Sequence, residues 1–141
     1  MTSVMRFHAS VSAASRFRFT VLAGISAERY RAIARRMDIG LALKLSWHSY
    51  AQTTFPSKVI ELAAMGMLVC TTSISDIPDI FEGESAILLS AETPVELAAA
   101  LREAATDRTR SAARARNGRA RVLERFSRAR VGAELGAFLL R

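Results

Sequence analysis

Short apolar runs alternate with amphipathic stretches along most of this chain. Four of the runs have the length and residue types of β-strands, and they span residues 17–22, 38–43, 67–72 and 85–89. The run Met-Leu-Val-Cys-Thr-Thr at 67–72 is typical of a buried strand. Because strands alternate with helices, the pattern predicts an α/β fold, a Rossmann-like parallel sheet of about four strands flanked by helices.

Residue types that begin and end helices separate the expected strands. Ser26 is placed to cap a helix whose apolar residues follow at helical spacing. Pro56 suits the first position of a second helix, and Gly66 suits its left-handed stop. A turn with a short helix is expected at 77–81. The stretch 93–105 begins with the capping box Thr-Pro-Val-Glu and predicts a further helix.

The last third of the chain is rich in arginine. If residues 108–126 form one helix, four arginines fall within an arc of about 60°, opposite an apolar side. These are Arg110, Arg114, Arg121 and Arg125. Gly118 is the position at which this helix is expected to be interrupted. Such a stripe is typical of a surface for anionic lipid headgroups or nucleic acid, and the ordinary alternative is a solvated helix face.

Composition narrows the classes of protein that fit this pattern. Half of the 141 residues are apolar and 23% are charged, as in soluble globular proteins. No apolar run approaches the ~20 residues of a membrane-spanning helix. The single cysteine, Cys70, excludes an internal disulfide framework and a cysteine-cluster metal site, and we expect no metal. The first 19 residues lack the continuous apolar core of a signal peptide, so a cytoplasmic location is expected.

The net charge of +7 conceals a strong segregation of charge along the chain. Residues 1–60 carry nine basic and two acidic side chains. Residues 61–100 carry seven acidic side chains and no Lys or Arg, and residues 101–141 carry eleven Arg and four acidic side chains. The basic excess favours polyanions or anionic lipid surfaces as partners and does not choose between them.

A polar stripe marks the start of the helix that follows Pro56, and it consists of Ser57, Lys58 and Glu61. A helix N-terminus offers N–H groups and the positive end of a dipole, which favours phosphate, and Lys58 adds a full positive charge. Glu61 is placed to accept hydrogen bonds from a pair of sugar hydroxyls, so the stripe fits a nucleotide. The alternative, which the spacing alone favours, is an exposed ion pair between Lys58 and Glu61.

An ordered series of stretches resembles the C-terminal half of GT-B-type retaining glycosyltransferases, the large group 1 family. The stretches are DIGLAL at 38–43, FPSKVIELAAMGMLVCTT at 55–72, IPD at 77–79, and 119–131, which includes ERFS at 124–127. The last of them resembles the family's closing helices, which implies two such helices at the C-terminus. The resemblance makes residues 18–141 a partial donor-binding domain and leaves residues 1–17 unassigned.

The C-terminal domain of that family binds a nucleoside-diphosphate sugar, which is a substrate, and no cofactor is implied. The resemblance assigns Glu61 to the ribose hydroxyls and the backbone N–H groups of Ser57 and Lys58 to the diphosphate. The first Glu of the family's motif falls on Thr53, so that half of the motif is missing and Thr53 becomes a candidate contact to the sugar. Pro56 replaces the family's usual Gly and has no N–H to give.

The polar, aromatic loop between residues 44 and 55 contains two further candidates, Trp47 and His48. Its aromatic rings are suited to stacking on a base, and His48 is suited to a contact with the sugar or the phosphates. The alternative for His48 is a loop histidine above a hydrophobic anchor. We therefore expect His48, Trp47 and Thr53 as candidate contacts to the sugar or base of the donor.

Two parts of the family pattern have no counterpart in this sequence. They are the Arg and Lys that clamp the diphosphate, and the acceptor-binding domain, both of which would precede residue 17. We expect a fragment, a truncated product or one subunit of a split enzyme, inactive without a separate acceptor-binding subunit or domain. The alternative is a non-catalytic nucleotide-binding or protein-interaction module. Many of these transferases act on lipid-linked acceptors, so an anionic membrane surface, at its inner face, is favoured over nucleic acid.

Overall fold

The computed structural model describes residues 20–51, 53 and 55–140. The chain divides into two units, residues 1–30 and 31–141, and each is described by itself. In the first unit, residues 20–22 form no strand, although one was expected at 17–22, and 17–19 lie outside the described residues. Val21 and Leu22 are exposed, and an apolar run is stabilised as a strand only where it packs against neighbours.

The first helix begins where the sequence predicted it. The Ser26 hydroxyl accepts a hydrogen bond from Arg29 N at 3.2 Å, and this contact caps α2 (Ala27–Ala34). The apolar residues at helical spacing after Ser26 end at Met37, but α2 ends one turn earlier, at Ala34. Met37 is half exposed and is not part of a buried face.

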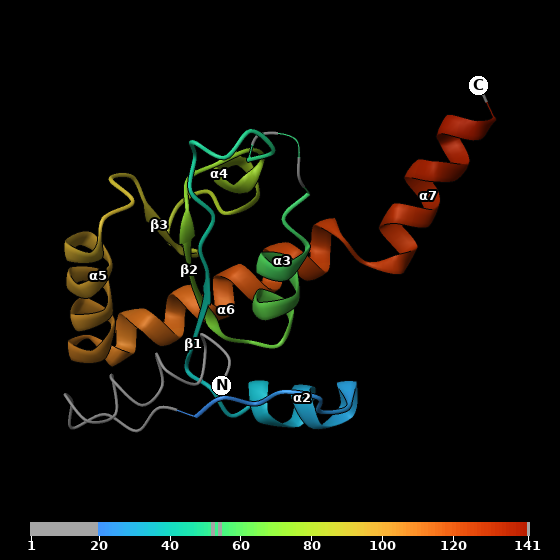
Figure 1. The fold of residues 1–141 in the computed structure, drawn as a ribbon. Coiled ribbons are helices and arrows are strands. Elements are labelled where there is room, and N and C mark those ends of the chain that lie inside the picture. The colour runs from blue at the N-terminus through green and yellow to red at the C-terminus, as the bar shows by residue number, and fades with distance from the viewer. Residues whose placement is uncertain (1–19, 52, 54, 141) are drawn as a thin grey trace. The chain divides into compact units, whose positions relative to one another are not determined.

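A parallel sheet forms the centre of the second unit (Figure 1). Its strands are β1 (Ile39–Ala42), β2 (Leu68–Thr72) and β3 (Ile87–Leu89), in the order β1-β2-β3. Gly40 is paired with Val69 and Thr71 with Leu88, and both pairs of strands are parallel. Every residue of β2 is buried, which confirms the prediction of a buried central strand. The α/β class is thus confirmed, with three strands within the described residues instead of about four.

Helices flank the sheet, and all of those expected after residue 56 are present. They are α3 (Ser57–Ala64), α4 (Ile77–Ile80), α5 (Pro94–Thr106), α6 (Arg108–Arg125) and α7 (Arg128–Leu139). The helices α3 and α6 pack against each other and against β2, and α5 contacts β3 and α6 (Figure 1). The two closing helices are α6 and α7, and no residue of α7 is buried.

The core lies between the sheet, α3, α4 and α6. Its largest side chain that is almost fully buried is Phe81, which directly follows α4. From α3 it takes Val59, Leu62 and Ala63, and the Cβ that Gly40 lacks would lie 3.0 Å from the Leu62 side chain. The missing side chain of Gly40 therefore lets α3 approach β1 closely.

The helix α6 continues through Gly118, so the expected interruption at this residue is wrong. Gly118 is buried, and a Cβ added there would lie 2.4 Å from the backbone oxygen of Ser85. The glycine therefore serves the close approach of α6 to the segment before β3, which outweighs its poor helix propensity.

The carboxyl ends of β1 and β2 are joined by two threonine side chains. Thr71 Oγ1 donates to the oxygen of Ala42 at 2.8 Å, and Thr72 Oγ1 donates to the oxygen of Lys44 at 2.5 Å. Thr72 Oγ1 also accepts from the Lys44 N–H at 3.2 Å. These bonds fix the backbone at the end of the sheet where ligands of open α/β folds bind.

Candidate functional site

A cleft of about 280 Å³ lies at the carboxyl ends of β1 and β2, beside the first turn of α3. We call it the strand-end cleft. Its polar lining residues are Lys44, Ser57, Lys58 and Ser75, and its apolar ones are Ala42, Leu43, Phe55, Pro56, Val59, Ile74 and Ile77. A concave site with an apolar surface and a few convergent polar groups is the usual form of a small-molecule site.

The start of α3 differs in detail from the sequence prediction. Pro56 is the residue before the helix, with φ −81° and ψ 51°, and Ser57 is the first helical residue. No side chain caps this end, and the Ser57 N–H donates to the oxygen of Phe55 at 2.9 Å. Ser57 therefore brings its hydroxyl to the strand-end cleft, while its N–H, expected to hold a diphosphate, is already bonded within the chain. Gly66 ends this region at φ +90°, as predicted.

Lys58 and Glu61 form an ion pair, with Lys58 Nζ and Glu61 Oε2 2.6 Å apart. Their side chains are 57% and 40% exposed, so solvent screens the pair and it stabilises the helix by only a few tenths of a kcal/mol. An exposed ion pair between these two residues is the alternative to a nucleotide site that their spacing in the sequence favoured. Lys58 also lines the strand-end cleft, whereas Glu61 does not.

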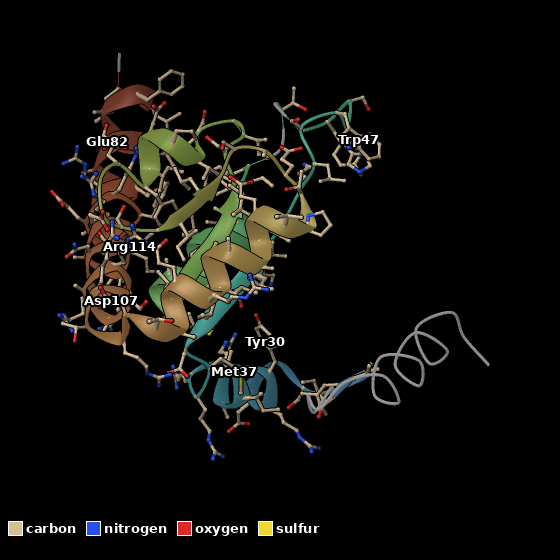
Figure 2. All side chains as sticks on the ribbon, turned by 90° about the vertical axis from the view of Figure 1, so that its left-hand side faces the viewer. Tyr30, Met37, Trp47, Glu82, Asp107 and Arg114 are labelled. Atoms are coloured by element: carbon tan, nitrogen blue, oxygen red, sulfur yellow. The ribbon has the colours of Figure 1, made fainter. Side chains whose placement is uncertain are left out.

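The aromatic residues of the loop form a stack of their own. Ring centroids are 4.2 Å apart for Trp47 and His48, and 5.2 Å apart for His48 and Tyr50. Trp47 is 72% exposed and lies at the end of the sheet opposite Met37 (Figure 2). Trp47, His48 and the exposed Thr53 do not line the strand-end cleft, so the structure does not bring them together with Ser57 and Lys58 there.

Two glutamates hold the loops around these residues. Glu92 accepts the Ser46 N–H with both carboxylate oxygens at 3.0 Å, and it also accepts the Ser46 hydroxyl at 3.1 Å. Glu96 accepts backbone N–H groups of Ser90, Ala91 and Glu92 at 2.9–3.0 Å, and these bonds, that of Ser90 foremost, hold its pKa below the ordinary value. The predicted capping box is thus half formed, because Glu96 bonds the preceding loop while Thr93 caps Glu96 N.

Sequence reasoning missed two residues of the cleft. Lys44 is the second residue after β1, and its place at the carboxyl end of the strand predicted at 38–43 was a signal that could have found it. Ser75 lines the opposite wall with φ 50°, a left-handed conformation that no residue type in this stretch announced. Cys70 is buried in β2 and does not line the cleft, and burial raises the pKa of its thiol to about 11.

The four arginines of the α6 stripe all have partners within the chain, although only Arg114, at 16% exposed, is largely covered. Arg110 and Arg114 both bind the carboxylate of Glu84, with Arg110 Nη2 2.7 Å from Glu84 Oε1. Arg121 Nη1 lies 3.5 Å from Glu82 Oε2. Arg125 Nη1 donates to the backbone oxygen of Asp79 at 3.2 Å. Figure 2 shows Glu82, Arg114 and Asp107 along α6. Glu82 and Glu84 of the acidic middle segment, which sequence spacing could not locate, thus provide counter-charges for three of the four arginines.

A second hollow, of about 650 Å³, lies between α4, the end of α6 and the start of α7. Phe55 lines this hollow as well as the strand-end cleft, and its ring lies edge-on to that of Phe126, with centroids 5.9 Å apart. Its charged residues include the Arg130–Glu134 pair at 2.6 Å.

The described residues contain neither a metal-binding cluster nor a membrane-spanning helix. No group of three or more His, Cys, Asp or Glu side chains there is arranged to hold a metal ion. Among the described helices, none has both the length and the apolar character needed to cross a bilayer.

Comparison with known proteins identifies the family of this chain. A family model described as "glycosyl transferase-like" matches residues 5–136. No curated protein and no solved structure gave a match. Because the family model covers most of the sequence, this chain belongs to the glycosyl transferase-like family.

Proposed function

We propose that this chain binds the nucleoside diphosphate of a sugar donor in the strand-end cleft. The family has a role in glycosyl transfer, which in general uses a nucleotide-sugar donor and an acceptor. Within that family we assign the chain to the donor-binding half of a retaining, GT-B-type, group 1 enzyme. The observation that carries the proposal is the meeting of Lys44, Ser57 and Lys58 in one cleft at the carboxyl ends of two parallel strands.

The chemistry of the cleft suits a diphosphate joined to a less polar group. The ammonium groups of two lysines and the hydroxyl of Ser57 can donate hydrogen bonds to phosphate oxygens. The positive end of α3 faces the same region and adds to the attraction. Ala42, Leu43 and Ile74 give the remaining wall an apolar surface against which part of a nucleoside can pack.

Groups outside the cleft complete the proposed site. Glu61 lies one turn further along α3, and we assign its carboxylate to the ribose hydroxyls. Its present contact with Lys58 uses Oε2, and a ligand would share this carboxylate with the lysine. The exposed stack of Trp47 and His48 provides flat faces for the base or the sugar, and Thr53 is a candidate sugar contact in the same loop.

Donors placed before the leaving diphosphate gains charge would stabilise the transition state of transfer. In this site those donors would be the two lysines, whose positions are set by β1 and α3. The same groups bind the diphosphate of the intact donor, so they contribute to affinity as well as to transfer.

Calorimetric titration of the chain with UDP, GDP and ADP tests this proposal. We expect saturable binding of one of them, weakened about tenfold in Glu61→Ala, which removes the proposed ribose contact. Glu134→Ala is the matched control, because it breaks an exposed ion pair of the same 2.6 Å length on α7. Absence of binding up to millimolar nucleotide would defeat the proposal.

A second candidate function is a nucleotide-binding or protein-interaction module without transfer activity. Thr53 offers a hydroxyl where the resemblance implies a carboxylate, and the Ser57 N–H is bonded to Phe55. Both features reduce the groups available to a reacting sugar. Binding of a nucleoside diphosphate with which no nucleotide sugar competes would favour this second function.

A further inference from the structure

Lys44 is fixed at the edge of the strand-end cleft by its own backbone. Its N–H donates to Thr72 Oγ1 at 3.2 Å, and its oxygen accepts from the same hydroxyl at 2.5 Å. Thr72 is 1% exposed and ends β2, so this pair of bonds joins Lys44 to the rigid centre of the sheet. The side chain of Lys44 therefore starts from a position that a ligand finds already formed.

The ammonium group of Lys44 retains hydrogen-bonding capacity and charge. Its Nζ donates to the oxygen of Tyr50 at 3.2 Å and lies 4.5 Å from the centre of the Tyr50 ring. An ammonium has three N–H donors, so two are available for a ligand. No ion pair within the part of the chain that the structure describes includes Lys44.

The other lysine of the cleft is in a different electrostatic situation. Lys58 Nζ lies 2.6 Å from a carboxylate oxygen of Glu61, which offsets its charge. An incoming anion must compete with that carboxylate at Lys58, but it meets no such competitor at Lys44. At similar distances, Lys44 should therefore attract a phosphate more strongly than Lys58 does.

We propose that Lys44 is the principal cation for the diphosphate in the strand-end cleft, a role that rests on the proposed function. The same ammonium contacts Tyr50, the end of the aromatic stack, so Lys44 joins the phosphate-binding part of the site to the exposed rings of the loop. A ligand with a diphosphate at Lys44 would have its nucleoside or sugar within reach of those rings. Neither the arginine stripe of α6 nor the helix start provides this connection.

The test compares nucleoside diphosphates with the matching monophosphates and nucleosides on the full chain. For the base that the wild-type chain prefers, Lys44→Gln should weaken diphosphate binding by about tenfold or more, the effect of a charge-assisted hydrogen bond. Binding of the nucleoside alone should change by less than about twofold. Lys44→Arg should restore most of the diphosphate affinity, because it retains the charge and the donors.

Arg116→Gln is the matched control. Arg116 lies near Ile39 and Leu68, at the amino ends of β1 and β2 and away from the strand-end cleft. The substitution removes one positive charge there and should leave nucleotide binding unchanged. Thermal unfolding of every variant shows whether its fold is retained, and Lys44→Met provides a second neutral substitution if Lys44→Gln unfolds.

Two results would overturn the role of Lys44 and leave the proposed function intact. One is diphosphate affinity in Lys44→Gln within twofold of wild type, and the other is an equal loss for the diphosphate and the nucleoside. A smaller loss in Lys44→Gln than in Lys58→Gln would likewise contradict the order of the two lysines. Failure of the wild-type chain to bind any of the diphosphates would instead defeat the proposed function itself.

Discussion

Gly118 of α6 lies close to the backbone of the loop before β3. Gly118→Ala would place a methyl group 2.4 Å from the Ser85 oxygen, so either the helix or the loop must move. We expect the free energy of unfolding to fall by about 1–3 kcal/mol, as for other overpacked core positions. Chemical denaturation measures it, and the control is Gly132→Ala, which has no atom within 4 Å of the added Cβ.

The gain in helix propensity works in the opposite direction to the clash. Alanine favours a helix interior over glycine by about 1 kcal/mol, so Gly132→Ala should leave stability unchanged or raise it. Equal effects of the two substitutions would show that the contact between Gly118 and Ser85 does not limit the approach of α6.

Glu84 is the carboxylate at which two arginines of α6 converge. Hydrogen bonds from Arg110 and then Arg114 lower its pKa from 4.5 to about 2. Because the folded state has the lower pKa, the stabilisation is fully present above pH 4.5 and is lost as the pH falls towards 2. The melting temperature of the wild type should therefore fall over this interval more steeply than that of Glu84→Gln. Parallel melting curves would contradict this assignment.

The two closing helices have similar caps but very different surroundings. Asp107 accepts the Arg110 N–H at the start of α6, and Ser127 accepts the Arg130 N–H at the start of α7. Only α6 has buried residues, so Asp107→Ala should lower the global free energy of unfolding by about 1 kcal/mol. Ser127→Ala should increase amide hydrogen exchange in α7 and leave the global transition unchanged. Equal shifts of the global transition would contradict this difference.

The loop of aromatic residues is held by hydrogen bonds to Glu92 more than by burial. Glu92→Ala removes the acceptor of the Ser46 N–H and hydroxyl, so the loop should open more often. We expect faster amide exchange at residues 44–51 and several-fold weaker nucleotide binding, with the unfolding transition little changed. Glu134→Ala again serves as the control, and unchanged exchange in the loop would contradict the role of Glu92.

The sequence predicted those helices and strands that are marked by nearby residues, such as a capping residue at a helix start. The helix from Pro94 was predicted because Thr93 is a capping residue and Pro94 suits the first turn. Strand β2 was predicted because its side chains are all apolar or small. Of the strand expected at 17–22, the described residues 20–22 form none, and the break expected at Gly118 was wrong because it depends on a partner far along the chain. Ser85, which explains Gly118, is 33 residues away, and no periodicity encodes that contact.

The candidate site was predictable to a similar extent. Ser57 and Lys58 were proposed because a helix start after a strand–loop segment is visible in the sequence; both line the strand-end cleft, and their contact with a diphosphate stays a prediction. Lys44 was missed because its importance comes from what surrounds its ammonium group, which is Tyr50 and no carboxylate within the described residues. The roles of Glu61, Trp47, His48 and Thr53 stay predictions until a ligand is measured.

Charge is arranged in the folded molecule more evenly than in the sequence. The acidic middle third supplies Glu82 and Glu84, and the basic last third supplies the arginines that bind them. The stripe on α6 therefore acts as an internal contact of the fold. A membrane or nucleic acid would compete with these exposed carboxylates for the arginines, and an anionic partner for this face stays a prediction.

The molecule as a whole should bind a donor without transferring its sugar. Thr53 has no carboxylate, and Pro56 has no N–H to offer a leaving diphosphate. Incubation of the purified chain with nucleotide sugars of the preferred base should release no nucleoside diphosphate above a protein-free blank. Steady release that Lys44→Gln diminishes would contradict this expectation.

The position of α6 in the chain has a consequence for biosynthesis. All three strands are made before α6, yet the core around Phe81 is closed by Val122 of that helix. A nascent chain that ends after β3 has a sheet with an uncovered apolar side and an acidic segment without its arginines. We therefore expect the complete core to form only after residues 108–125 have left the ribosome.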